Sequence, residues 1–522
     1  MSINDTLGDT PEIDRVDVEA VNSARVRQPL YTARKKIFPK RANGTFRRFK
    51  WLVMLVTLSI YYLMPWIRWD RGPNAPDQAV LLDIANRRFY FFMIEIWPQE
   101  FYYIAGLLVM AGFGLFLVTS VVGRAWCGYT CPQTVWVDLF LVVERAIEGD
   151  RNARMKLDTA PWTVDKIWKR LSKHAIWLLI GVLTGGAWIF YFADAPTLLD
   201  SFVHGDAPPI AYITVSVMTA TTYVFGGLMR EQVCTYMCPW PRIQAAMLDE
   251  NSLTVTYNDW RGEPRTHGAK KALAAGVIGG DCVDCNACVV VCPMGIDIRE
   301  GQQLECITCA LCIDACDSVM DKLGRPRGLI SYATLADYQS NMAIATANGT
   351  HPISPLRIHD ETGKLANAIE HFHINKMFRP RVLLYSAAFA AVGVGLLTAL
   401  LLRDRLALNV LHDRNPQFVT LSDGSIRNGY TVKILNMVPL RREMELSLEG
   451  LEGATMVAEP SDQPAGRSLK FTAEPDQASP LKIFVRLPSA TDDSEDEQFH
   501  FVLNDKTLGE SDRYEASFNR PE

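Results

Sequence analysis

The chain has 522 residues, which is too long for one ordinary domain. Hydrophobic residues make up 48% of it, and a mean hydropathy close to zero suits a mixture of membrane segments and soluble regions. The net charge of -5 conceals an uneven distribution, because residues 1–20 contain six acids and one arginine whereas residues 21–50 contain ten Lys and Arg and no acid. A basic block directly before an apolar stretch is typical of a cytoplasmic flank.

Five segments are apolar enough to form membrane-spanning helices, which need about 20 residues each. In chain order they are roughly residues 51–67, 101–122, 175–193, 209–229 and 382–402. The first could be mistaken for a signal peptide, but the stretch from Tyr61 to Trp66 is bulky and aromatic and offers no small-residue cleavage site. We therefore expect an uncleaved anchor, a membrane domain of four spans over residues 51–248, and a fifth transmembrane helix at residues 381–403.

The charges of the loops predict the orientation of these spans. Residues 123–174 contain nine Lys and Arg, whereas residues 194–209 contain none and three aspartates. The positive-inside rule then places the amino terminus, with an expected disordered tail over residues 1–50, in the cytoplasm and the carboxyl-terminal region in the periplasm. All cysteines would lie on the cytoplasmic side, where thiols stay reduced and available to metals.

Eight cysteines lie in two tandem groups within residues 249–380, which we expect to form a cytoplasmic ferredoxin-like domain. The first group has the spacing C-x2-C-x2-C-x3-C-P, and the second repeats the spacing without the proline. In two-cluster ferredoxins the fourth ligand of each cluster comes from the other motif. The pattern therefore predicts one [4Fe-4S] cluster on Cys282, Cys285, Cys288 and Cys316, and a second on Cys306, Cys309, Cys312 and Cys292. A pair of zinc sites is the alternative interpretation.

The other four cysteines belong to an internal repeat. The second and fourth apolar segments are each followed by C-x3-C-P and an amphipathic stretch, with matching cysteines 107 residues apart: Cys127 and Cys131, then Cys234 and Cys238. Because proline suits the first position of a helix, we expect Cys131 and Cys238 to be helix N-caps, and each pair to contain a thiolate of lowered pKa. Thiolates select Cu(I) among first-row ions. The repeat therefore predicts a copper site, with four packing cysteines as the alternative.

The remainder of the chain adds a β domain and no further cofactor motif. From about residue 409 short, partly alternating runs predict an all-β sandwich that serves as a scaffold or docking module. No histidine lies within the five spans, and no C-x-x-C-H, P-loop or strand-linked G-x-G-x-x-G is present, which argues against haem and nucleotide cofactors. Four histidines near the expected cytoplasmic membrane edges are interpreted as interface or solvent residues, with assistance to a metal as the alternative: His174, His267, His371 and His373.

Four segments closely resemble the CcoG/FixG family of cytochrome oxidase accessory proteins, which includes RdxA and RdxB. They are Lys36–Pro39, Trp126–Thr134, Arg230–Pro239 and Met320–Gly324. The resemblance implies a multi-domain α + β protein of the bacterial inner membrane, with a five-helix membrane domain, a cytoplasmic two-cluster ferredoxin-like segment and an immunoglobulin-like sandwich over residues 409–522. It also implies that the protein assists assembly of cbb3-type cytochrome c oxidase by reducing Cu(II) to Cu(I).

On this basis we predict a cupric reductase in which Cys127, Cys131, Cys234 and Cys238 bind copper while two clusters relay single electrons. The expected partners are the lipid bilayer, cbb3-type oxidase assembly factors, a copper transporter or chaperone, and an electron donor that the sequence does not name. A homodimer is plausible, and no nucleic acid is expected. Two other functions stay open, namely a quinol-oxidising electron-transfer conduit and a non-enzymatic oxidase assembly scaffold.

Overall fold

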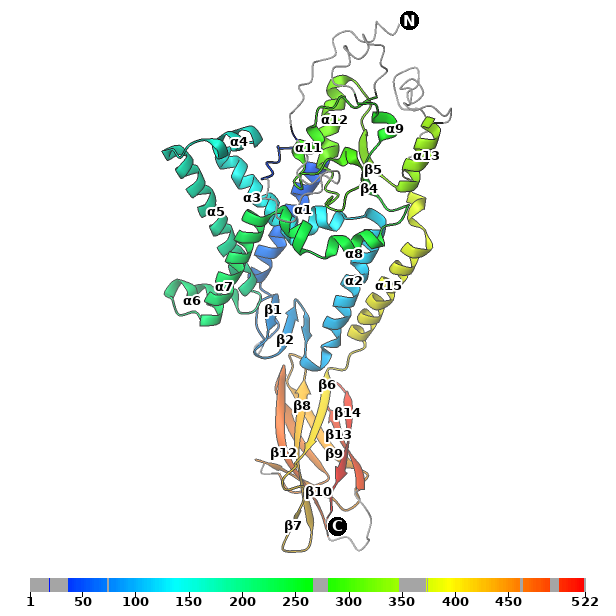
Figure 1. The fold of residues 1–522 in the computed structure, drawn as a ribbon. Coiled ribbons are helices and arrows are strands. Elements are labelled where there is room, and N and C mark those ends of the chain that lie inside the picture. The colour runs from blue at the N-terminus through cyan, green and yellow to red at the C-terminus, as the bar shows by residue number, and fades with distance from the viewer. Residues whose placement is uncertain are drawn as a thin grey trace, which may run out of the picture. The chain divides into compact units, whose positions relative to one another are not determined.

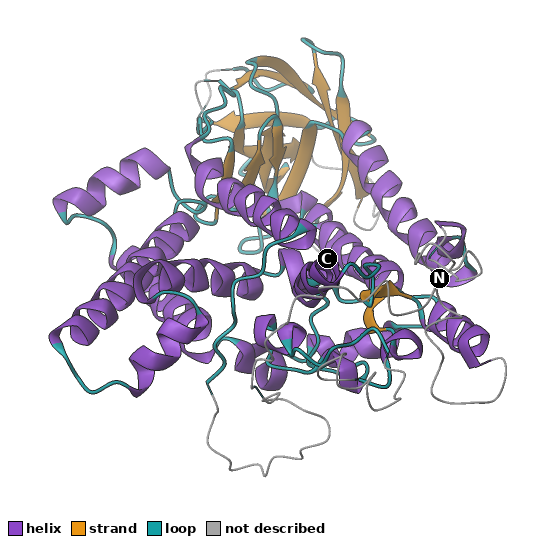
Figure 2. Ribbon diagram, turned by 90° about the horizontal axis from the view of Figure 1, so that it is seen from above, coloured by secondary structure: helices purple, strands orange, loops and turns teal. Residues whose placement is uncertain are grey.

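The computed structural model describes residues 18, 36–72, 75–265, 280–346, 372, 374–460, 463–488 and 497–520. They belong to two compact units, of which the first takes in residues 1–67 and 80–395 and the second residues 68–79 and 396–522. Helices dominate the first unit and strands the second (Figure 2). Most of the expected disordered tail, residues 1–50, lies outside the described residues, although the first helix already begins at Thr45.

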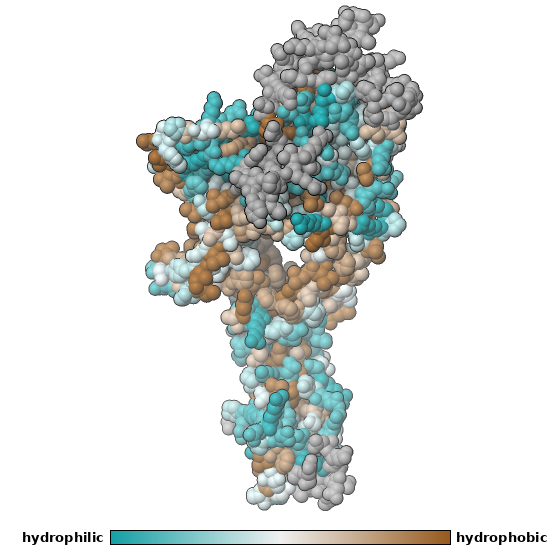
Figure 3. Space-filling model, viewed as in Figure 1, coloured by the Kyte–Doolittle hydropathy of each residue, from teal (hydrophilic) through white to brown (hydrophobic). Residues whose placement is uncertain are grey.

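Within the described residues, four helical segments are long and apolar enough to cross a membrane. They are Thr45–Trp66 with α1 (Thr45–Leu63), Pro98–Val122 with α2 (Tyr102–Val122), Pro209–Met229 with α7 (Pro209–Thr222), and Pro380–Leu401 with α15 (Pro380–Leu401). Figure 3 shows hydrophobic residues gathered over the helices of this unit. The expected span at residues 175–193 lies in α5 (Val164–Ile189), which has a charged first half and ends before Ala193. The count of five spans therefore stays a prediction.

The internal repeat is present in the backbone as well as in the sequence. Each membrane helix of the repeat ends at a residue with positive φ, Gly123 at +59° and Arg230 at +46°. A π-helical turn follows in both cases, η4 (Trp126–Thr130) and η6 (Val233–Met237). The amide of Cys131 donates to Trp126 O at 2.9 Å, and that of Cys238 to Val233 O at 2.8 Å, so each bond spans five residues. Short π-helical turns of this kind occur frequently at functional sites.

A buried charge cluster connects the two halves of the repeat. The turns lead into α3 (Pro132–Glu148) and α8 (Trp240–Met247). Near the end of α3, Glu144 is 5% exposed and its Oε2 lies 3.0 Å from Arg230 Nη2 and 3.1 Å from Arg154 Nη1, while Lys173 Nζ is 3.6 Å from its Oε1. A buried carboxylate requires such partners. Glu144 thus connects Arg230, where the membrane helix of the second repeat ends, to α4 (Arg151–Thr159) and α5 beside the first repeat.

The eight-cysteine region consists of loops and short helices, as expected from the sequence, together with one small sheet that was not predicted. Strands β4 (Thr254–Tyr257) and β5 (Ile330–Ala333) pair antiparallel, with Thr254 opposite Ala333. The helices are α9 (Asp259–Gly262), α11 (Ala287–Val291), α12 (Leu311–Leu323) and α13 (Leu335–Thr346). α11 stops just before Cys292-Pro293, whereas α12 continues because Asp317 stands where a second proline would have ended it.

The first membrane helix begins against α12 of the cluster region (Figure 1). The carboxylate of Asp314 accepts hydrogen bonds from the amides of Phe46 at 3.2 Å and Arg47 at 2.7 Å, in the first turn of α1. A negative charge at a helix amino terminus stabilises it by about 0.3–1 kcal/mol when exposed and up to about 2 kcal/mol when partly buried. Arg47 Nη1 in turn lies 2.8 Å from Asp138 of α3. These contacts hold the cluster region on the membrane helices.

The first unit also contains elements away from the cysteines. They are a small antiparallel sheet of β1 (Val80–Asp83), β2 (Arg88–Phe91) and β3 (Ile94–Ile96), and the helix α6 (Ala195–His204).

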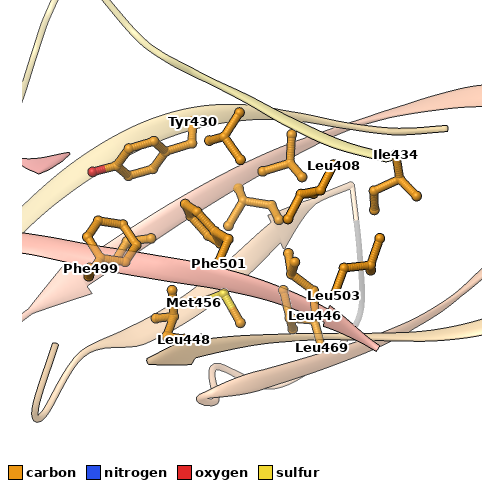
Figure 4. Close-up of a cluster of buried hydrophobic side chains, with 14 of the residues drawn as sticks. Leu408, Tyr430, Ile434, Leu446, Leu448, Met456, Leu469, Phe499, Phe501 and Leu503 are labelled. Atoms are coloured by element: carbon orange, nitrogen blue, oxygen red, sulfur yellow. The ribbon is translucent and has the colours of Figure 1, made fainter. Parts of the chain in front are cut away.

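The second unit is an all-β sandwich, as predicted. One sheet has the order β10 (Thr455–Glu459), β12 (Gln477–Leu487), β8 (Ile426–Asn436), β6 (Leu406–His412), with β7 (Val419–Thr420) beside β8. The other has the order β11 (Ser468–Ala473), β9 (Arg442–Glu449), β13 (Glu497–Asp505), β14 (Ser511–Phe518). The rings of Tyr430, Phe499 and Phe501 meet edge to face in the shared core, with centroids 5.0–5.7 Å apart (Figure 4).

Candidate metal centres

The two cysteine motifs of the cluster region have the same local backbone. Two and four residues after the first cysteine of each motif, the chain adopts positive φ, at Asp284 and Asn286 in the first motif and at Thr308 and Ala310 in the second. Helices α11 and α12 begin directly after Asn286 and Ala310. Left-handed residues of this kind curl the loop, so that the first three thiols of each motif point to a common space.

The fourth cysteine of each motif joins the other group. One cavity is lined by Cys282, Cys285, Cys288 and Cys316, and a second by Cys292, Cys306, Cys309 and Cys312, with Cys288 at its edge. The exchange occurs because α11 and α12 pack against each other, with Cys292 at the carboxyl-terminal end of α11 and Cys316 in the second turn of α12. The structure thus brings together the two ligand sets expected from the spacing.

The residues of both cavities fit [4Fe-4S] clusters. Burial, and then the charge of Cys309, raises the pKa of Cys292 to about 12, and burial likewise raises the pKa of Cys306 to about 11. Grouped cysteines, of which Cys292 and Cys306 are desolvated in this way, are a ligand set that a cationic iron centre stabilises as thiolates. Apolar side chains such as Ile307 and Val255 complete the second cavity and exclude water from it.

Arg299 is a residue of the first cavity that the sequence prediction missed. Its guanidinium donates to Asp284 Oδ1, Asn286 Oδ1 and Asp297 Oδ2, each at 2.7 Å, and its side chain is 7% exposed. Two of these acceptors are the left-handed residues of the first loop, so Arg299 holds the loop in shape and also places a positive charge in the wall of the cavity. No motif marks this arginine in the sequence.

The four cysteines of the C-x3-C-P pairs also lie close together. Burial, and then the charges of Cys131, Cys234 and Cys238, raises the pKa of Cys127 to about 12. The Cys127 thiol donates to Gln244 Oε1 at 3.1 Å, which joins the first pair to helix α8 of the second. Burial raises the pKa of Cys234 to about 12 as well. The lowered pKa expected at a helix N-terminus concerns Cys131 and Cys238 and stays a prediction, whereas desolvation dominates at Cys127 and Cys234.

The two prolines differ in their helical positions. Cys131 is the N-cap of α3, with Pro132 at the first helical position, as predicted. The corresponding prediction for Cys238 is wrong, because α8 begins at Trp240 and its N-cap is Pro239. Among the described residues, no three His, Cys, Asp or Glu side chains already converge on a single metal position, so one ion bound by all four thiols would require rotation of their side chains.

The first C-x3-C-P pair is packed directly on the ligand loop of the second cavity. A Cβ atom on Gly128 would lie 2.6 Å from Ile307 O and 3.1 Å from the backbone nitrogen of Cys309. Tyr129 Oη donates to Cys309 O at 3.2 Å, and Arg124 Nη1 donates to Cys306 O at 3.2 Å. The candidate copper site is therefore in direct contact with the backbone of the loop that carries ligands of the second candidate cluster site.

Of the four histidines named from the sequence, the structure describes His174. His174 Nδ1 lies 2.9 Å from Tyr223 Oη, between α5 and the turn η5 (Tyr223–Met229). His267, His371 and His373 lie outside the described residues.

Long apolar helices, two cavities of four cysteines and a separate β sandwich define a membrane iron-sulfur protein of the electron-transfer class. Residues 229–335 match the family described as a 4Fe-4S dicluster domain, residues 104–148 a 4Fe-4S binding domain, and residues 396–521 the IG-like fold at the C-terminal of FixG.

Three relatives place the chain more narrowly. It is 69% identical over 509 residues to nitrogen fixation protein FixG of Rhizobium meliloti (strain 1021), covering 98% of this chain and 97% of the relative. It is 53% identical to protein RdxA of Cereibacter sphaeroides over 89% of this chain and 92% of RdxA, and 56% identical to RdxB of the same organism over 83% and 88%. The chain therefore belongs to the CcoG/FixG family.

Proposed function

We propose that this protein reduces Cu(II) to Cu(I) in the bacterial inner membrane and supplies Cu(I) for the copper centre of a cbb3-type cytochrome c oxidase. The proposal rests on one observation. The thiols of both repeats are close enough for their charges to interact, and they pack beside the cysteines of the second cavity. Thiolates prefer Cu(I) to Cu(II), so a site built from them favours the reduced ion.

Each residue of the site has a part in this reaction. Cys127, Cys131, Cys234 and Cys238 bind the substrate ion, and Gln244 orients the buried thiol of Cys127. [4Fe-4S] clusters, when bound by the two groups of four cysteines, supply single electrons at low potential. One electron per ion balances the reduction of Cu(II). The close contact of Gly128 with the Cys309 backbone keeps the distance between electron source and copper short.

The topology and partners belong to the same proposal. The cysteines lie on the cytoplasmic side and the β sandwich in the periplasm, because the basic loops flank the segments that bear the thiols. Oxidase assembly factors and a copper transporter or chaperone would then receive the product.

A second candidate function is supported by one finding. The 4Fe-4S binding family matches residues 104–148, which contain two cysteines only, Cys127 and Cys131. If these joined Cys234 and Cys238 around a third cluster, the protein would be a conduit for electrons, for instance from quinol, and not a copper enzyme.

Iron, sulfide and copper contents of the anaerobically purified full-length protein distinguish the two functions. The comparison variant carries alanine at Cys127, Cys131, Cys234 and Cys238. A copper enzyme retains the iron of two clusters in both forms, while the variant loses copper binding and cupric reductase activity. A conduit has the iron of three clusters and loses a third of it in the variant. If the variant binds and reduces copper as well as the parent, the copper role of these cysteines is wrong.

A further inference from the structure

The two C-x3-C-P repeats have the same backbone but very different surroundings. Tyr129 and Tyr236 occupy the same position of the repeat, 107 residues apart, yet Tyr129 is 7% exposed and Tyr236 is 73% exposed. The residue directly after the first cysteine is Gly128 in one repeat and Thr235 in the other. The copper-site candidate therefore has a covered side and an open side.

The covered side is the first repeat. Gly128 lies against backbone atoms of Ile307 and Cys309, where a larger residue would collide with them. Tyr129 donates to Cys309 O at 3.2 Å, and Arg124, which is 5% exposed, donates to Cys306 O at 3.2 Å. Cys127 itself is 8% exposed. A carrier molecule has no room to approach a metal ion from this direction.

The open side is the second repeat. All twelve cysteines lie within the described part of the chain, and Cys238 is the exposed one among them. Its neighbour Met237 is 51% exposed, and Tyr236 beside it is more exposed still. A thioether and a thiol next to each other are both soft ligands, which suit Cu(I). Met237 and Cys238 thus place two soft ligands in the exposed part of the second repeat.

We propose that the second repeat is the exchange side of the copper site, where Cys238, assisted by Met237, passes Cu(I) between the buried thiols and a thiol-bearing carrier. The inference rests on the proposed copper function and adds the side of the site at which copper is exchanged. In the exchange, a bond from Cu(I) to Cys238 forms or breaks as one to the carrier thiolate breaks or forms. The proton released by one thiol is taken up by the other, and copper keeps its oxidation state.

Ligand exchange of this kind needs a sulfur atom that the incoming group can reach. By analogy with thiol exchange, access to the attacked centre controls the rate. Cys127 meets this requirement poorly because of its burial, whereas Cys238 meets it well. Cys131, which holds the position of Cys238 in the first repeat and is only partly exposed, is the matched control.

The test uses the full-length, cluster-loaded protein in detergent without oxygen, carrying Cu(I) that was added as Cu(I). Transfer of copper to the water-soluble chelator bathocuproine disulfonate is followed by absorbance after rapid mixing. We expect Cys238→Ser to slow the transfer about tenfold or more, the lower end of effects seen when a group supporting a metal site is lost. Cys131→Ser also removes a copper ligand but leaves the exposed sulfur atom of Cys238 in place, so it should make the transfer faster.

A labelling measurement supports the kinetic one and does not depend on a variant. In the copper-free wild-type protein, a water-soluble maleimide should modify Cys238 before Cys131, Cys127 and Cys234, and added Cu(I) should protect Cys238. Met237→Leu should slow the copper transfer, whereas Met93→Leu, which alters a methionine 74% exposed on the β2–β3 turn, should not.

Three results would overturn the inference: equal slowing by Cys238→Ser and Cys131→Ser, earlier labelling of Cys131 than of Cys238, or no protection of Cys238 by copper. Because the transfer begins with Cu(I) and involves no reduction, it is independent of the reductase assay. Failure of the wild type to reduce Cu(II) would refute the proposed function while leaving this result intact. Iron content verifies that each variant is folded.

Discussion

Gly128→Ala should push the first C-x3-C-P repeat away from the loop that carries Cys306 and Cys309 of the second cavity. The new Cβ would lie 2.6 Å from Ile307 O, whereas ordinary contact begins at 3.4 Å. The atoms it meets belong to the backbone of Ile307 and Cys309, so no flexible side chain can turn aside. Overpacking of this kind typically costs about 1–3 kcal/mol.

The effect can be measured by thermal unfolding of the full-length protein in detergent. Cluster absorbance reports on the first unit, and a cost of this size should lower its apparent Tm by several degrees, since about 1 kcal/mol corresponds to roughly 2–4 °C in a domain of 150–250 residues. Unfolding of the β sandwich, followed separately in the same sample, should not change. The longer path between the two sites should also slow copper reduction, even where iron content is unchanged.

Gly112→Ala is the matched control, because a Cβ at Gly112 has no atom within 4 Å. In the interior of α2, this change should be neutral or stabilise the helix by up to about 1 kcal/mol. If Gly128→Ala unfolds at the temperature of the wild type and reduces copper at the same rate, the tight contact with Cys309 is not a feature of the protein in solution.

Three further outcomes are expected. Arg299→Gln should lower the midpoint potential of the first cluster in an EPR-monitored redox titration, because it removes a positive charge from the cavity wall. Arg299→Lys keeps the charge and should retain most of the potential. Loss of the cluster in both variants would mean that Arg299 acts only by holding the loop. Cys292→Ser should damage the cluster of the second motif and Cys316→Ser that of the first, and the reverse pattern in their EPR signals would contradict the cross-ligation. Phe501→Ala, at a fully buried position, should destabilise the β sandwich by about 3–5 kcal/mol in denaturant unfolding with unchanged iron content, and an unchanged midpoint would show that this core is not packed as described.

The arrangement of the eight cluster-region cysteines was predictable because their chemistry is local. Spacing of two residues between cysteines brings three thiols to one loop, and the structure adds only that positive φ values at Asp284, Asn286, Thr308 and Ala310 produce that loop. The structure also adds that α11 is short, ending before the Cys292-Pro293 pair, whereas α12 continues past Cys316 and Asp317. Four membrane helices were visible in the sequence as apolar runs. Helix α5 mixes charged and apolar residues, so its composition alone does not assign a spanning segment to it.

The sequence by itself determined the ligand sets, the internal repeat and the β sandwich, because each depends on residue type and spacing along the chain. Only the tertiary structure decided how the thiols ionise and which of them can be reached. Burial raises the pKa of Cys127 and Cys234, an effect that the spacing of the cysteines does not predict. The roles of Arg299, Asp314 and Gly128 were decided there too, because contacts between residues far apart in the chain depend on packing, which no local pattern records.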